Sequence, residues 1–463
     1  MLDKGLVEDV LQTALETGGD FSEVFVEERF TNQMAFQSSR LEKNLSGRDF
    51  GVGIRVFHGL QSVYAYTNDA SREGLLKAAR TAAKAIQGKQ NGGTAIIPLM
   101  KETISTLHPI QIMPRKAAKT NKLAVMRKAN EIIRNYDPEI VQAIIRMIDE
   151  EQNVLIANSE GKFVEDQRVR SRISFVSVAS NGTDMQTGSY GPGAYQGFEF
   201  IENLDLHYFA KESARMAKTM LHADHAPSGK FPVIIDNEFG GVIFHEACGH
   251  GLEAASVAKN ASVFANKIGE RVASDLVTYI DDGTLENGWG SINVDDEGEK
   301  ARKNVLIEHG ILKGYMIDKL NGRRMGMSPT GSSRRESYRY APTSRMTNTY
   351  IAPGQSTPKE IIADTEHGIY AKYMGGGSVN PGTGDFNFAV NEAYLVKNGK
   401  IDRPIRGATL IGNGAKTILN IDRVANNLGH GAGMCGASSG SLPVNVGQPM
   451  VRVSEITVGG KEA

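Results

Sequence analysis

Residues 245–250 read His-Glu-Ala-Cys-Gly-His, and no other stretch of the chain places so specific a demand on the fold. His245 and His250 could bind a divalent metal through neutral ring nitrogens, with Glu246 beside a water that the metal activates. A metal requires at least one more protein ligand. If these residues form a metal site, the fold must therefore supply a further ligand, and a distant segment is one source of it.

The spacing of the two histidines requires an irregular helix. In a regular α-helix, side chains five residues apart diverge by about 140°, whereas those four apart diverge by about 40°. A single π-type bulge would bring both histidines to one face, and Gly249 is the residue that best tolerates the strain. We therefore predict a bulged helix. The alternative is that the two histidines are unrelated, one packed in a core and one at a helix end.

Three residues are candidates for the third ligand. Cys435 lies in a glycine-rich run whose backbone amides could stabilise a thiolate. Cys248 could share the face of the first histidine, or it could be a small buried hydrophobic residue. His430 could support the site or lie on the surface. Glu253, one turn beyond the second histidine, could orient a ligand or be an ordinary exposed glutamate.

The length and the pattern of the chain predict an α+β protein of three domains. A chain of 463 residues exceeds one ordinary core. Polar linkers at about 88–109 and 221–230 indicate domains at residues 1–100, 110–222 and 228–463. The first two should be α/β segments with a mixed sheet and flanking helices. The third should be β-rich and barrel-like, with short strands and a hairpin turn at Asn398-Gly399.

Composition and charge argue against several functional classes. The formal net charge of −1 provides no general attraction to nucleic acid or to anionic lipid. No apolar run reaches 18 residues, so we expect no membrane span. The N-terminus lacks the pattern of a signal peptide, and two cysteines cannot form a disulfide framework. We therefore expect a cytoplasmic protein.

Two other clusters resemble functional sites less convincingly. His222 and His225 flank an acid, but they lie beside Pro227 in the expected linker. A run of arginines and tyrosines resembles a surface for single-stranded nucleic acid. Without a positive net charge, a polar loop that lines a cleft is the better interpretation of this run. Its residues are Arg334, Arg335, Tyr338, Arg339, Tyr340 and Arg345.

The chain resembles the TldD branch of the TldD/PmbA family of metalloproteases over nearly its whole length. The matching stretches are Tyr66-Thr-Asn-Asp-Ala-Ser-Arg-Glu-Gly, His245-Glu-Ala-Cys-Gly-His-Gly-Leu-Glu, Lys267-Ile-Gly-Glu-Arg-Val-Ala, Asp281-Asp-Gly-Thr, Arg345-Met-Thr-Asn-Thr-Tyr-Ile-Ala-Pro-Gly, Cys435-Gly, Val446-Gly-Gln-Pro and Thr457-Val-Gly-Gly.

The resemblance implies that His245, His250 and Cys435 are the metal ligands and that Glu246 is the general base. It places Cys248 at a variable position of the motif. It further implies one Zn²⁺ per catalytic chain, although iron, cobalt or manganese could also occupy such a site.

The resemblance also implies the substrate and the assembly. Family members cleave short or unfolded peptides, held extended in an internal cleft. They act with a PmbA/TldE-like partner, which lacks the His-Glu motif, or as homodimers. Arg345 and Asn348 lie in a matching stretch, so we expect them to contact substrate; the alternative is that they are structural turn residues.

The leading hypothesis is therefore a zinc-dependent peptidase that uses a metal-activated water and a glutamate base. The rival is a non-catalytic peptide-binding or regulatory protein in which the metal is structural or absent. A third hypothesis is a metal-dependent hydrolase of esters or sugars.

Overall fold

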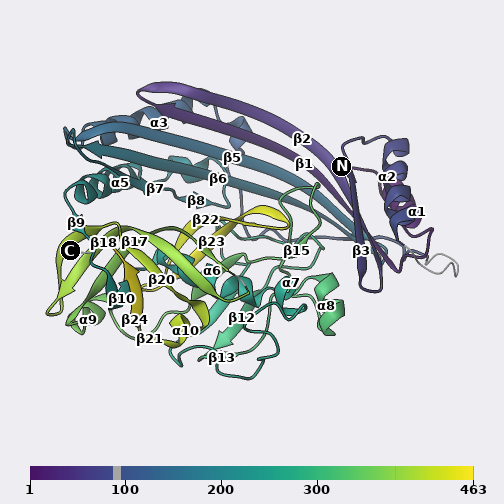
Figure 1. Ribbon diagram of the computed structural model, residues 1–463. Helices are drawn as coiled ribbons and strands as arrows, with labels where there is room; N and C mark the ends of the chain where they lie inside the picture. Colours follow the sequence, from purple (N-terminus) through teal and green to yellow (C-terminus); the bar gives the residue numbers. More distant parts are fainter. Residues whose placement is uncertain (87–94, 381, 462–463) are drawn as a thin grey trace.

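The computed structural model describes residues 1–86, 95–380 and 382–461. A sheet of long strands runs the length of the molecule, with the C-terminal part packed beneath it (Figure 1). A strand of 19 residues, such as β2, β5 or β6, spans roughly 60 Å at about 3.3 Å per residue. The strands of this sheet are β1 (Phe21–Gln37), β2 (Arg40–His58), β3 (Gln61–Thr67), β4 (Met100–Glu102), β5 (Ile140–Asn158), β6 (Lys162–Ser180), β7 (Met185–Tyr190) and β8 (Gly193–Ala194).

Helices cover the two ends of the long sheet (Figure 1). At one end, α1 (Lys4–Ala14) and α2 (Arg72–Ala85) pack against the β1–β3 region. At the other end, α3 (Lys119–Arg134) and α5 (Leu206–Leu221) cover β5 and β6, near the short α4 (Glu199–Glu202) and η1 (Pro114–Lys116). Ser71 caps α2 by accepting from the amide of Gly74, as residues with this side chain commonly do.

The first two predicted segments share this one sheet. The strand order is β3-β2-β1-β5-β6-β4, and β1 of the first segment pairs antiparallel with β5 of the second. The predicted linker at 88–109 contains β4, which adds to the sheet edge beside β6. Residues 87–94 of that linker lie outside the described part of the chain. The division into three domains stays a prediction.

The C-terminal part contains a closed barrel, which confirms the predicted β-rich, barrel-like architecture. Strands β17, β10, β24, β20 and β18 pair in this order, and pairing between β17 and β18 closes the ring. Asn398 and Gly399 both have positive φ and join β18 to β19, which confirms the predicted two-residue hairpin turn. The strands of this sheet are β9 (Asp224–His225), β10 (Gly229–Ile235), β17 (His367–Val379), β18 (Asp385–Lys397), β19 (Lys400–Arg406), β20 (Thr409–Asn413), β21 (Ile421–Val424) and β24 (Val451–Gly459).

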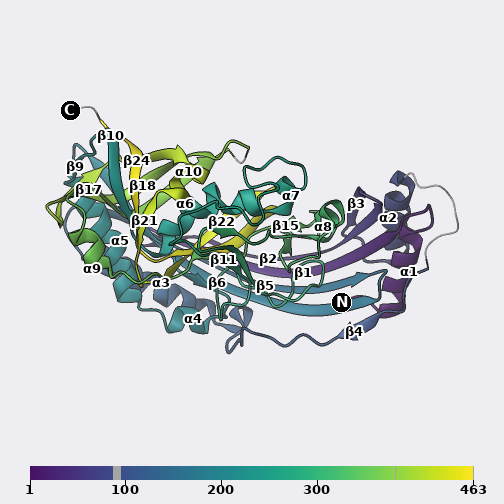
Figure 2. The same ribbon diagram turned by 90° about the horizontal axis from the view of Figure 1, so that it is seen from below.

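A third sheet has the order β13-β12-β11-β16-β23-β22. Strand β22 forms its edge, directly beneath the long strands (Figures 1 and 2). Its strands are β11 (Tyr279–Asp282), β12 (Lys303–Glu308), β13 (Ile311–Leu312), β16 (Asn348–Ile351), β22 (Gly429–Ala437) and β23 (Gly440–Gln448). The remaining elements are η2 (Glu238–Gly241), α6 (Val242–Ala247), η3 (Gly249–Leu252), α7 (Ala254–Val257), α8 (Lys319–Met325), β14 (Ser333–Arg334), β15 (Thr343–Ser344), α9 (Pro358–Ala363) and α10 (Gly414–Leu419). No helix among the described residues is long and apolar enough to cross a membrane.

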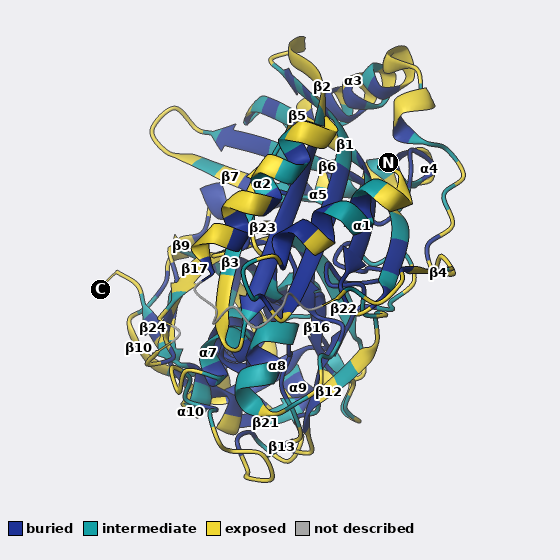
Figure 3. Cartoon of the chain, turned by 90° about the vertical axis from the view of Figure 1, so that its right-hand side faces the viewer, coloured by how far each residue is buried: buried dark blue, intermediate teal, exposed yellow. Residues whose placement is uncertain are grey.

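Buried ion pairs join the long sheet to the C-terminal part. On β2, Arg55 contacts Glu23 at 2.6 Å and Glu297 at 2.5 Å, and Arg335 reaches Glu23 at 2.6 Å. Glycine at position 51 of β2 is required by close approach, because a Cβ there would lie 2.1 Å from the ring of Tyr338. Figure 3 shows that the strands in the middle of the molecule are largely buried.

We expect Arg55→Met to lower the free energy of unfolding by about 3–5 kcal/mol, because it leaves Glu23 and Glu297 buried without this partner. Arg48→Met, on the same strand, is the matched control. Arg48 pairs with Glu28 but is 65% exposed, so its loss should cost less than about 1 kcal/mol. Denaturant titration of both variants measures the difference, and equal costs would contradict the assigned role of the buried pairs.

Candidate metal centre

The His-Glu motif lies on a helix that breaks rather than bulges. Helix α6 ends at Ala247, Cys248 leaves helical geometry with φ −122° and ψ −47°, and the 3₁₀ turn η3 follows. The predicted π-type bulge is therefore wrong. Glycine is required at 249 for packing, because a Cβ there would lie 2.2 Å from the sulfur of Met346. Asn237, which precedes η2, makes no side-chain cap, since its amide donates to the carbonyl of Asn427 instead.

The break brings both histidines of the motif to one place, together with the distant cysteine. Ligand atoms of His245, Glu246, His250 and Cys435 all lie within 4.8 Å of one another. Cys435 Sγ is 3.3 Å from His250 Nε2, and Glu246 Oε2 is 3.5 Å from the same nitrogen. Within the described ranges, this is the one such group of at least three potential metal-binding side chains.

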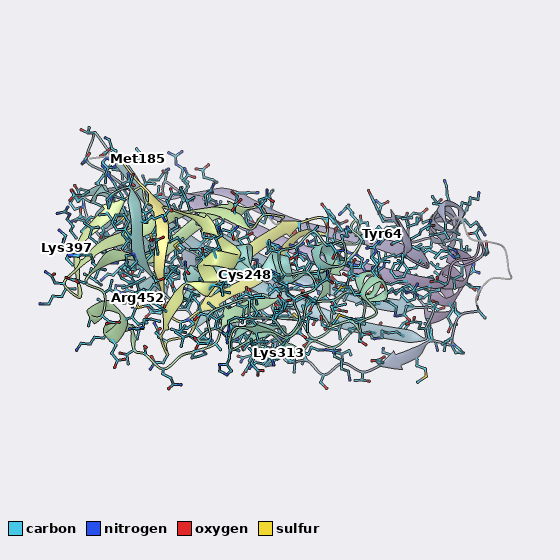
Figure 4. The ribbon with its side chains drawn as sticks, turned by 60° about the horizontal axis from the view of Figure 1, so that its bottom comes forward. Tyr64, Met185, Cys248, Lys313, Lys397 and Arg452 are labelled. Atoms are coloured by element: carbon cyan, nitrogen blue, oxygen red, sulfur yellow. The ribbon has the colours of Figure 1, made fainter. Side chains whose placement is uncertain are left out.

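The other two candidates for the third ligand lie outside this group. Cys248 is fully buried in the C-terminal part (Figure 4), and burial raises the pKa of its thiol. Its sulfur is 3.9 Å from the carbonyl of Gly414. His430 lies beside the ring of Tyr350, with 5.3 Å between the centroids, and borders a cleft.

The donor set fits a metal. His245 Nδ1 is 2.9 Å from Thr349 Oγ1, and His250 Nδ1 is 3.0 Å from Glu253 Oε2. Both Nε2 atoms are thereby left for the cluster, and that of His245 is buried without a hydrogen-bond partner among the described residues. Burial raises the pKa of the Cys435 thiol, but the two neighbouring imidazoles have the larger effect and lower this pKa to about 3. The thiolate, which is the form that binds metals, is therefore favoured.

One short segment supports all three potential ligands. Thr349 contacts the first histidine, and the amide of Met346 donates to Glu253 Oε1 at 3.3 Å. Arg345 Nη2 donates to the backbone carbonyl of Cys435, and its Nε lies 3.8 Å from Glu253 Oε1. Glu253 thus has the orienting contact that the sequence suggested as one possibility.

The two residues predicted to contact substrate lie inside the protein. Arg345 is 1% exposed, and Asn348 is fully buried. The amide of Asn348 donates to the carbonyl of Asp282 and to Ser291 Oγ, and its oxygen accepts from Gly290. Neither residue lines either of the two clefts described below, and this together with their burial favours the structural alternative over a direct substrate contact. Sequence reasoning missed Thr349 as a support, although it lies in the same matching stretch.

The two weaker clusters supply no residue to the metal-binding group. His222 Nε2 pairs with Glu139 at 2.8 Å, and neither histidine of the linker belongs to the metal-binding group. In the arginine-rich run, Arg334 and Arg335 are buried and do border a cleft, as predicted.

Two clefts lie between the long sheet and β22. The first, of about 310 Å³, contains the aromatic side chains Tyr190, Phe239 and Tyr373 and extends to His430. The second, of about 270 Å³, borders the β22–β23 hairpin. Arg172 lines both, so the two clefts adjoin along the strand that carries Cys435.

Comparison with known proteins agrees with this geometry. Models of the first, central and C-terminal domains of the PmbA/TldA metallopeptidases match residues 22–86, 114–221 and 228–460. The chain belongs to the PmbA/TldD family. A metalloprotease TldD homolog of Haemophilus influenzae is 40% identical over 424 residues, which cover 89% of this chain and 87% of that protein. A metalloprotease TldD homolog of Buchnera aphidicola subsp. Acyrthosiphon pisum is 36% identical over 451 residues, which cover 95% of this chain and 93% of that protein. These names support a protease of the TldD branch.

Solved structures share the fold of this TldD-family chain. A crystal structure from Thermotoga maritima matches with a TM-score of 0.80 and 21% identity, over 98% of this chain and 100% of that one. TldE from Thermococcus kodakarensis matches with a TM-score of 0.78 and 18% identity, over 98% of this chain and 100% of that one. At these identities the likeness shows the fold alone.

We expect Cys435→Ala to abolish stable binding of one metal ion per chain, because it removes the thiolate beside His250. Cys248→Ala is the matched control and should retain the metal, since this thiol lies outside the cluster. Elemental analysis after dialysis against limiting zinc measures both. Retention by the first variant, or loss by the second, would refute the assignment.

Glu253→Gln should weaken zinc affinity by about 10–100-fold, because the carboxylate that orients the His250 ring is lost. The exposed Glu286→Gln serves as the control. Competition with a chromophoric chelator gives both affinities, and equal affinities would show that the contact is incidental.

Proposed function

We propose that this chain is a zinc-dependent metallopeptidase that hydrolyses short or unfolded peptides. In this proposal His245, His250 and Cys435 bind the zinc, and Glu246 is the general base. The observation that carries it is the convergence of four donor groups within 4.8 Å, with the buried Nε2 of His245 left without a partner among the described residues.

The chemistry follows from the position of Glu246. When bound, zinc supplies Lewis-acid activation of a water and of the scissile carbonyl. Glu246 is partly exposed beside the cluster, so it can accept a proton from the attacking water. The same carboxylic acid then gives this proton to the leaving amine nitrogen, and the C–N bond breaks. Glu253 and Thr349 hold the two imidazoles in place throughout.

The adjoining clefts suit an extended peptide. A chain lying along the edge strand β22 would present alternate side chains to the two sides. Recognition through backbone groups of a strand edge tolerates many sequences. Arg172 and Trp289 already donate to the carbonyls of Ala432 and Gly433, so a peptide would use the remaining backbone groups and the cleft walls.

We further propose that the chain assembles with a PmbA/TldE-like subunit or with a second copy of itself in the cytoplasm. The likeness in fold to TldE supports a shared mode of assembly. The scarcity of cysteine, with only two in the chain, supports a reducing compartment.

Glu246→Gln separates the peptidase from a non-catalytic binding protein. We expect kcat to fall by about 10²–10⁴-fold, because proton transfer is lost while the zinc content stays at one per chain. Hydrolysis of a quenched fluorescent peptide, with the TldE-like partner added, measures the rate. Equal inactivity of the parent protein and the variant, with peptide still bound, would favour the binding protein. Hydrolysis of esters or sugars but not peptides would favour a different hydrolase.

A further inference from the structure

Arginines outnumber carboxylates among the residues that line the second cleft. Three carboxylates line it: Glu150, Asp296 and Glu336. The basic residues that line it are Arg29, Arg168, Arg170, Arg172, Arg334 and Arg335. The carboxylates of the cleft lining cannot therefore pair with every one of these arginines.

Acidic groups neutralise half of these arginines. Arg168 Nη1 lies 2.7 Å from Asp296, and Arg335 Nη2 lies 2.6 Å from Glu23. Arg29 lies 3.6 Å from both Glu150 and Glu27, and Arg168 also lies 3.1 Å from Asp166. The third acidic group of the cleft, Glu336, accepts from the backbone amide of Ser441.

The other three arginines have no carboxylate partner in the described part of the chain. Their guanidinium groups donate to backbone carbonyls instead. Arg170 binds the carbonyls of Trp289 and Ser291 at 2.9 and 2.8 Å. Arg334 binds those of Met346 and Pro443. Arg172 binds those of Gly191 and Ala432 at 3.2 and 3.0 Å.

Burial makes these uncompensated charges costly. Arg170 and Arg334 are 5% and 3% exposed, and charged residues are rarely buried unless they are paired. Burial lowers the pKa of all three guanidinium groups, and that of Arg334 to about 9. Carbonyl dipoles compensate a cation only in part, so an anion entering the cleft would be strongly attracted.

The walls of the cleft indicate the kind of anion. Beside the arginines lie apolar side chains, among them Ile148, Trp289, Ile292 and Leu442. A group with an apolar body and one carboxylate fits this combination better than a phosphate chain does. Guanidinium also binds carboxylates in a two-pronged geometry.

The cleft borders the strand that carries Cys435, although none of the four residues of the candidate metal centre lines it. Met434, which lines it, precedes Cys435 on β22, and Leu442 pairs with Cys435 in the β22–β23 register. Successive side chains of a strand point to opposite faces, so Met434 and Cys435 face different sides of the hairpin. A peptide passing the edge of β22 can therefore reach both the metal ligands and the arginines.

We propose that Arg170, Arg172 and Arg334 form a subsite that binds a carboxylate of the peptide substrate. That carboxylate is either the C-terminal α-carboxylate or the side chain of Asp or Glu. The proposal rests on the proposed peptidase function, and it adds a preference for acidic peptides.

Binding to the inactive Glu246→Gln protein, loaded with zinc, tests this without turnover. The probes are fluorescein-labelled hexapeptides of alternating Ala and Val, read by fluorescence anisotropy. One pair differs only in a free or amidated C-terminus. A second pair is amidated and carries Glu or Gln as its fourth residue. We expect one acidic member to bind about tenfold more tightly than its neutral counterpart. The pair that shows the preference identifies the source of the carboxylate.

Arg334→Met and Arg172→Met, each added to this background, should reduce that preference to less than about twofold. Replacing an unpaired buried charge by an apolar side chain need not destabilise the fold, and the partly exposed Arg172 provides a second variant if Arg334→Met fails to fold. Arg48→Met, on the far exposed part of β2, is the control and should keep the preference.

Equal binding of acidic and neutral peptides, or a preference that survives both substitutions, would overturn the subsite. Its failure is distinguishable from failure of the peptidase function. Peptide hydrolysis without any acidic preference refutes the subsite alone. An acidic preference in a protein that never cleaves peptides refutes only the peptidase.

Discussion

The structure of the site depends on one buried segment, residues 345–349, which lies between two parts of the chain that are far apart in sequence. Thr349 holds His245, and Met346 and Arg345 contact Glu253, which in turn holds His250. Arg345 also binds the carbonyl of Cys435. Parallel pairing of β16 with β23 fixes this segment next to the hairpin that carries the cysteine. Helix and hairpin therefore converge because a third element contacts both.

Local pattern was sufficient to predict much of the fold. The hairpin at Asn398-Gly399 follows from a short-range rule, and so does the capping of α2 by Ser71. The convergence of the histidines with Cys435 was predicted from the resemblance, because the residues alone left Cys248 and His430 open. Cys435 and His430 are placed by the register of β22 with β23, and Cys248 is directed towards Gly414, and spacing in the sequence reveals neither.

Tertiary packing explains why the π-type bulge is absent and why the structure favours a structural role for two residues predicted to contact substrate. The local argument assigned Gly249 to a helical bulge. In the structure the helix breaks at Cys248 instead, and glycine is required at 249 because the side chain of Met346 approaches closely. Arg345 and Asn348 were predicted to contact substrate because polar residues in a distinctive stretch suggest function. Their carbonyl and carboxylate partners lie on other strands and loops, and only the folded chain shows that those partners bury them.

The same limit applies to the arginines of β6, where the sequence Arg168-Val-Arg-Ser-Arg172 has the period of a strand. That period places three cations on one face, towards the β22–β23 hairpin. The sequence does not reveal that Asp296 forms an ion pair with Arg168, whereas Arg170 and Arg172 donate hydrogen bonds only to backbone carbonyls. For Arg168 and Arg170 the difference arises because the loop that follows β11 supplies the carboxylate of Asp296 to the first and the backbone carbonyls of Trp289 and Ser291 to the second. Identical side chains two residues apart thus acquire different roles, one tying the long sheet to the C-terminal part and the others leaving positive charge beside the strand that carries Cys435.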